Sequence, residues 1–195
     1  MHTSPASQKI RLIVFNALFI ALIFAMQLFG IGMIRLGVIN ITFYCSIIAV
    51  GTLLLGLKSG LIQAFAFGSI SLYTAITEPS ALVAPILAQS VPLLALMCYL
   101  PRLLVPVAAH LTYRITRASS KNERLGLTAG GSAASLVNSI LFLGIMLLAY
   151  LPMLADHPGV LASIGGVVLY GSIPEFIVAG IITPPLVLAL RKVRH

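Results

Sequence analysis

Long apolar runs follow one another along this chain, and they constrain its fold more than any other feature of the sequence. A helix that crosses a bilayer needs about 20 mainly apolar residues. Hydrophobic residues make up 59% of the 195 residues and charged residues only 8%, whereas an average soluble domain is about 25% charged. Such a composition cannot cover a water-facing globule with polar surface. It therefore excludes a soluble enzyme or nucleic-acid-binding domain and predicts an all-α integral membrane protein.

Hydropathy along the chain predicts six transmembrane helices in a single membrane domain, residues 1–195. The second run is short for a full crossing, so we expect it to be tilted or to extend into the loop before it. Residues 81–90 are apolar but interrupted by proline, which predicts a loop over the bundle or a short re-entrant piece. The first run is longer than the apolar core of a signal peptide, so we expect it to be retained. The predicted spans cover about residues 12–34, 43–55, 61–76, 91–113, 127–151 and 164–190.

The distribution of basic residues predicts how these spans are oriented. Six spans place both termini on one side of the membrane, together with the loops after the second and fourth spans. Ten of the twelve Lys and Arg residues lie in those segments: Lys9, Arg11, Lys58, Arg114, Arg117, Lys121, Arg124, Arg191, Lys192 and Arg194. Because cytoplasmic loops are enriched in Lys and Arg, both termini are predicted to be cytoplasmic in a multi-pass protein of a bacterial cell membrane. The same bias explains the net charge of +8 without a nucleic-acid partner.

Several polar residues fall inside the predicted spans. Arg102 lies in the fourth span, Asn138 in the fifth and Glu175 in the sixth. An ionisable group inside a membrane is costly, so it marks a functional site or an internal pair. Other polar residues fall in the outer halves of the spans or in the loops above them, namely Tyr73, Gln89, Tyr99, Tyr170, Arg35 and Asn40. Together these residues predict a polar, substrate-binding cavity open to the outside.

Structural roles for the same residues remain open. In the alternative interpretation, Arg102 and Glu175 form an ion pair between helices and bind no ligand. Asn138 is alternatively an interhelical hydrogen-bonding residue, worth about 0.6 kcal/mol on average. Each tyrosine is alternatively an anchor at the membrane interface.

Small residues at four-residue spacing mark one face of the first span: Ala17, Ala21 and Ala25. Residues four apart lie on the same side of a helix, and a strip of small residues lets another helix approach closely. The strip therefore indicates either a contact with a partner helix or packing within the chain.

The sequence lacks the motifs of common membrane-bound enzymes. It has no GxxxxGK[ST] phosphate-binding loop and no HExxH motif, so it is not expected to hydrolyse ATP by the common route or to hold a catalytic zinc. Cys45 and Cys98 lie in apolar runs without CxxC spacing, which gives no sign of a disulfide framework or a metal site. We expect no enzyme activity, cofactor or metal in this chain.

Several segments of this sequence, taken in order, carry a resemblance to one family of membrane proteins. They are the alanine strip and residues 40–42, 55–60, 64–72, 100–105, 135–139 and 171–175. Over nearly its whole length the chain resembles the substrate-binding S components of energy-coupling factor (ECF) vitamin transporters. The resemblance implies tight binding of a vitamin from outside, beneath the first and third loops. It also implies association with a membrane scaffold subunit and two ATPase subunits, with the alanine strip in contact with the scaffold.

The resemblance favours pantothenate as the vitamin. Residues 135–139 and 173–175 are most similar to the pantothenate branch of the family. Pantothenate has one carboxylate, which Arg102 or Arg35 could bind bidentately, and hydroxyl and amide groups that suit Asn138 and Glu175. Ser172 stands where the family pattern has Asn, so pyridoxine and folate remain alternatives. A transporter that works alone, with Glu175 coupling transport to protons, and a membrane scaffold without a ligand are further alternatives.

Overall fold

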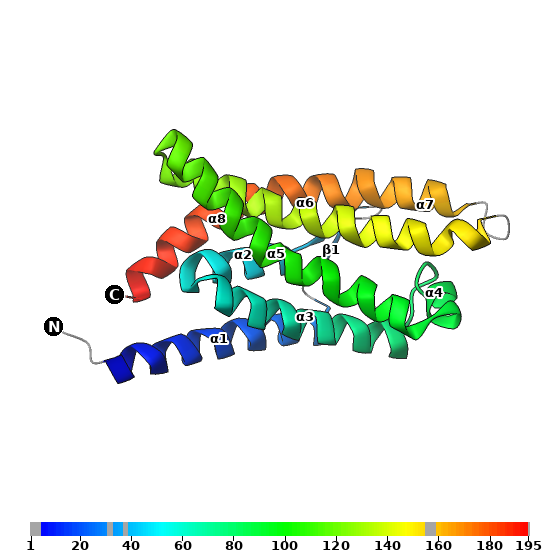
Figure 1. The fold of residues 1–195 in the computed structure, drawn as a ribbon, viewed down its shortest axis with the longest axis horizontal. Coiled ribbons are helices and arrows are strands. Elements are labelled where there is room, and N and C mark those ends of the chain that lie inside the picture. Colours follow the sequence, from blue (N-terminus) through cyan, green and yellow to red (C-terminus); the bar gives the residue numbers. More distant parts are fainter. Residues whose placement is uncertain (1–4, 31–32, 37–38, 155–158, 195) are drawn as a thin grey trace.

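The computed structural model describes residues 5–30, 33–36, 39–154 and 159–194 (Figure 1). Its long helices run side by side along the long axis of the molecule. Within the described residues, five helical segments are long and apolar enough to cross a membrane. This confirms the predicted class of helical membrane protein, whereas the count of six spans and the orientation of the termini stay predictions. Four of these segments correspond to the long helices α1 (Pro5–Leu28), α3 (Leu57–Thr77), α5 (Val91–Ser120) and α6 (Glu123–Tyr150). The fifth is the continuous run of α7 (Val160–Val167), the π-helical turn η2 (Val168–Ser172) and α8 (Ile173–Arg194).

A short β-hairpin follows α1, and the purely helical prediction lacks it. Strands β1 (Met33–Leu36) and β2 (Ile39–Thr42) pair antiparallel, with Arg35 opposite Asn40. The first predicted span reaches residue 34, but α1 ends at Leu28. Gly30 has a φ of 64°, a left-handed conformation that ends helices and favours glycine. The β-branched residues beyond it favour extended backbone, and the hairpin pairs that backbone with itself.

The helix after the hairpin is too short to cross a bilayer. α2 (Tyr44–Leu55) has 12 residues, about 18 Å of helix at 1.5 Å per residue, against a hydrocarbon core about 30 Å thick. Figure 1 shows the hairpin near the middle of the bundle, before α2 begins. The hairpin and α2 therefore replace one long helix. Two further short elements, α4 (Ala84–Gln89) and the 3-10 turn η1 (Leu151–Met153), lie at the opposite end of the bundle from the start of α1.

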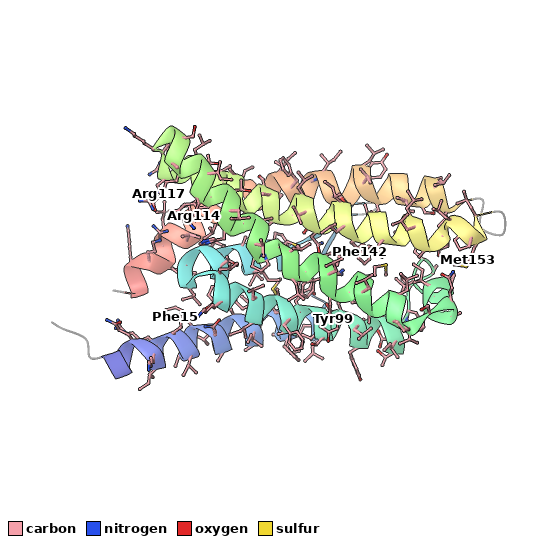
Figure 2. The ribbon with its side chains drawn as sticks, in the orientation of Figure 1. Phe15, Tyr99, Arg114, Arg117, Phe142 and Met153 are labelled. Carbon is pink, nitrogen blue, oxygen red and sulfur yellow. The ribbon has the colours of Figure 1, made fainter. Side chains whose placement is uncertain are left out.

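Apart from Arg102, the basic residues of the helices lie toward one end of the bundle. α1 begins and α8 ends at this end, where the α5–α6 turn also lies (Figure 1). Figure 2 shows Arg114 and Arg117 here on the last turns of α5. Arg191 of α8 forms an ion pair with Glu123 at the start of α6, and Arg117 donates a hydrogen bond of 2.9 Å to Tyr113. This end corresponds to the side that the sequence predicts to be cytoplasmic.

α6 packs closely on α5 and α8 through glycines. A methyl group added at Gly131 would lie 2.6 Å from the carbonyl oxygen of Ala179 and would also overlap the hydroxyl of Thr183. A methyl group at Gly130 would lie 2.9 Å from the carbonyl oxygen of Ala109. Small residues allow such close approach of helices in membranes, so these positions set the distance between α6 and its neighbours.

Gly131→Ala is therefore expected to destabilise the protein, since the added methyl group forces α6 and α8 apart. Overpacking of this kind costs about 1–3 kcal/mol. Gly144→Ala is a matched control on the same helix, because a methyl group there meets no atom within 4 Å. Thermal unfolding in detergent should show a lower Tm for Gly131→Ala and an unchanged or higher Tm for Gly144→Ala. Equal Tm values for the two variants would contradict the close packing of α6 on α8.

Candidate functional site

A cavity of about 660 Å³ lies between the helices, and residues of α1, α2, α3, α5, α6, α7, η2 and α8 line it. Small-molecule sites commonly have volumes of about 300–1,000 Å³. Apolar and aromatic side chains make up much of the wall, including Phe67, Met97, Phe142 and Leu143. A few polar and charged groups face the same space. This combination is typical of a binding site for a small, partly polar molecule.

Arg102 lies at the cavity wall in the middle of α5, with only 8% of its surface exposed. Its guanidinium group donates hydrogen bonds to the carbonyl oxygen of Met97 (2.8 Å) and to the hydroxyl of Ser71 (3.2 Å). It also stacks over the rings of Phe142 and Phe67, at 4.7 and 5.4 Å from their centroids. Nε is buried and has no hydrogen-bond partner among the described residues. The side chain is thus held in place, while one of its donors has no partner among the described residues.

Asn138 of α6 also lines the cavity, with Ser139 beside it. Its amide oxygen Oδ1 is buried and accepts no hydrogen bond from the described residues. A buried polar atom without a partner costs about 1–3 kcal/mol, and such an atom in a native protein calls for an explanation. A ligand that donates a hydrogen bond into the cavity would remove this cost.

Glu175 lies in the first turn of α8, and 7% of its surface is exposed. Tyr170 and Ser172 of η2 and Cys45 of α2 line the same cavity. Glu175 and Arg102 therefore face one space, from α8 and α5. The hydrogen bonds that Arg102 makes within the described residues go to Met97 and Ser71, not to Glu175.

The predicted substrate-binding residues divide into three groups. Arg102, Asn138, Tyr170 and Glu175 line the cavity. Tyr73, Gln89 and Tyr99 are not among the described residues that line it; Figure 2 shows Tyr99 on the side of α5 that faces α3.

Each of the three residues outside the cavity has another environment. The hydroxyl of Tyr99 lies 2.9 Å from that of Ser69, on α3. Tyr73 is 69% exposed, and Gln89 is exposed at the end of α4. A membrane depth read from the sequence does not specify which face of a helix a side chain occupies.

Arg35 and Asn40 form the third group, because they lie on the hairpin. Their backbones are paired, but their side chains lie outside the described part of the structure. Strand β2 packs against η2 and α8, so the hairpin lies against the segment that carries Glu175. The contribution of these two side chains stays a prediction.

Sequence reasoning missed part of the cavity wall. Gln27, Phe67, Ser71, Thr74 and Phe142 all line it. The rings of Tyr44 and Phe67 stack at 4.7 Å between α2 and α3. Helical spacing could have predicted some of the lining residues. Cys98 lies four residues before Arg102, and Phe142 lies four residues after Asn138. Residues four apart share a helix face.

The alanine strip lies on an outer face of α1. Ala17 and Ala21 are exposed and Ala25 is half-buried, whereas Phe19 and Ile23 of the same helix are buried against the bundle. Ala17 and Ala21 are therefore available to a partner helix. Contact with a partner remains a prediction.

Comparison with known proteins gives the same class. The family described as "ECF transporter, substrate-specific component" matches residues 11–190. The chain is also similar to the "Pantothenic acid transporter PanT" of Lactococcus lactis subsp. cremoris (strain MG1363), with 28% identity over 189 residues that cover 92% of this chain and 93% of that protein. Among the described residues, no group of three or more His, Cys, Asp and Glu side chains could hold a metal ion. The chain therefore belongs to the substrate-specific components of the ECF transporters and is a multi-pass protein of the cell membrane.

Proposed function

We propose that this chain binds pantothenate from outside the cell and presents it to an ATP-driven ECF transport complex. The observation that carries this proposal is the combination of the Arg102 guanidinium and the Asn138 amide in one cavity, each with a buried atom that lacks a partner among the described residues. An anionic ligand with additional hydrogen-bonding groups would satisfy both atoms. The similarity to a pantothenic acid transporter favours pantothenate among such ligands.

The chemistry of pantothenate fits the groups in the cavity. Its carboxylate would pair with Arg102, since hydrogen bonds between a guanidinium and a carboxylate are among the strongest in proteins. Its amide and two hydroxyls can donate to Asn138 and Glu175. Its dimethyl-substituted carbon chain would contact the apolar wall formed by Phe142, Leu143 and Met97.

The remaining parts of the transport cycle belong to separate subunits in this proposal. The sequence contains no phosphate-binding loop for ATP, so two ATPase subunits would supply the energy. A membrane scaffold subunit would bind the exposed strip of Ala17, Ala21 and Ala25 on α1. Six membrane crossings with both termini in the cytoplasm would place the basic end of the bundle next to the ATPases.

Ligand identification and titration of the purified protein test this proposal. We expect mass spectrometry of the denatured protein to detect bound pantothenate, and calorimetry to give 1:1 binding after the ligand is removed. Panthenol, which has an alcohol in place of the carboxylate, is the matched ligand. It should bind about 10 to 100 times more weakly, because a hydrogen bond to a charged group contributes about 1.5–3 kcal/mol.

The controls separate the alternative functions. Pyridoxine or folate binding more tightly than pantothenate would assign a different vitamin. Uptake that depends on the proton gradient and continues without any ATPase subunit would indicate a stand-alone transporter. Absence of binding to all three vitamins would contradict the proposal.

A further inference from the structure

The last membrane segment contains one turn that is wider than an α-helix. In η2 (Val168–Ser172) the backbone N–H of Ile173 donates to the carbonyl oxygen of Val168, five residues earlier. An α-helix pairs residues four apart, and a π-helical turn of this kind accommodates extra chain within a continuous helix. Pro174 follows directly and has no N–H to donate. In an α-helix its ring would also clash with the carbonyl group of Tyr170, so the sequence itself disfavours a regular helix here.

The cavity-lining residues change phase across this turn. Ser163 of α7 and Ser172 of η2 both line the cavity. They are nine residues apart, so at 3.6 residues per turn a regular α-helix would place them about 180° apart, on opposite faces. The π turn absorbs one residue over the five steps from Val168 to Ile173. Four of these steps lie between the two serines, so the angle falls to about 100°. Three of them lie between Tyr170 and Glu175, so the angle between those residues falls from about 140° to about 80°.

The outward face of the same segment shows an independent sign of the phase change. The large apolar side chains of this segment that are more than half exposed lie on both sides of the turn, at Leu161, Leu169, Ile177 and Ile181. A regular α-helix would spread the first and last of these over about 200°, whereas absorption of one residue keeps them within about 100°. The π turn therefore keeps these most exposed side chains on one side of the segment.

We infer that the π turn Val168–Ser172 sets the helical phase of the last membrane segment. It directs Glu175 of α8 into the cavity, while residues of α7 face the same cavity. Without the absorbed residue, Pro174 would take the place of Glu175 beside the face formed by Ser163 and Tyr170. In the structure Pro174 is half-buried and is not among the described lining residues. The residues of η2 and Pro174 are thus positioning residues for Glu175. The identity of the ligand in this inference rests on the proposed function, whereas the phase change does not.

Single cysteine variants along the segment test the phase directly. Ser163→Cys and Ser172→Cys are treated in nanodiscs with a charged methanethiosulfonate reagent, and peptide mass spectrometry locates the label separately from the native Cys45 and Cys98. Leu169→Cys and Ile177→Cys are the controls, because their side chains lie on the lipid-facing side. We expect both serine positions to react at least about tenfold faster than both controls, since a thiol reacts as the thiolate and requires water to ionise.

Addition of pantothenate separates this inference from the proposed function. Saturating pantothenate should slow labelling at Ser163→Cys and Ser172→Cys by at least about tenfold, because bound ligand excludes the reagent from the cavity. Fast labelling at Ser163→Cys with slow labelling at Ser172→Cys would indicate a regular helix and overturn the phase change. Fast labelling at both positions without protection by pantothenate would support the phase change and contradict pantothenate as the ligand.

Discussion

Arg102→Ala is expected to weaken pantothenate binding by at least about 30-fold, while the protein still inserts and folds. The carboxylate of the ligand would lose its charged partner inside a cavity where Arg102 is 8% exposed. Truncating one member of a buried, hydrogen-bonded charge pair costs about 2–5 kcal/mol of binding free energy. Calorimetry on detergent-purified protein measures the effect, and size-exclusion chromatography and Tm report whether the variant is folded.

Two further substitutions make this test specific. Arg102→Lys keeps the positive charge but lacks the planar group that can form two parallel hydrogen bonds to a carboxylate, so its affinity should fall between those of wild type and Arg102→Ala. Arg114→Ala removes an exposed arginine from the same helix and should leave the affinity unchanged. Wild-type affinity in Arg102→Ala would remove Arg102 from the site.

A double variant tests the alternative that Arg102 and Glu175 only neutralise each other. In a purely structural pair, removing one charge leaves the other buried and unpaired, so the double variant is more stable than either single variant. If both charges instead bind ligand, the double variant should not be more stable than the single variants. Each single variant should then bind pantothenate more weakly than wild type. The order of Tm values among Arg102→Ala, Glu175→Gln and the double variant decides between the two.

Ala17→Phe and Ala21→Phe are expected to block transport almost completely while ligand binding remains within about threefold of wild type. Both alanines are exposed on the outer face of α1, away from the cavity, and close contact between membrane helices depends on small residues. A phenyl ring would hold the partner helix away. Uptake of labelled pantothenate by cells that express the complete transporter measures the first effect, and calorimetry measures the second.

A control on the same helix shows whether the strip itself is responsible. Leu22→Phe enlarges another exposed side chain of α1 and should leave transport near the wild-type level. The complex should no longer copurify with Ala17→Phe or Ala21→Phe, but it should copurify with Leu22→Phe. Normal assembly and uptake in both alanine variants would show that the strip is not the contact surface.

The residues that line the cavity could be predicted from the sequence to very different degrees. Arg102, Asn138 and Glu175 could be found because a polar group inside an apolar run is costly wherever the helix faces. Ser71, Phe142 and Gln27 escaped detection, since serine, phenylalanine and glutamine do not stand out in a membrane helix until its face is known.

The sequence by itself determined the class of protein and the three polar residues that are most expensive to bury. Those properties depend on composition and on the local cost of transfer into a bilayer. Only the tertiary structure decided which faces meet. It placed Tyr73 and Tyr99 outside the cavity, replaced part of an expected helix with a hairpin, and turned Glu175 inward through the π turn. The physical reason is that the face a residue occupies depends on the phase of its helix and on the neighbours that pack against it, and one inserted residue changes that phase by about 100°.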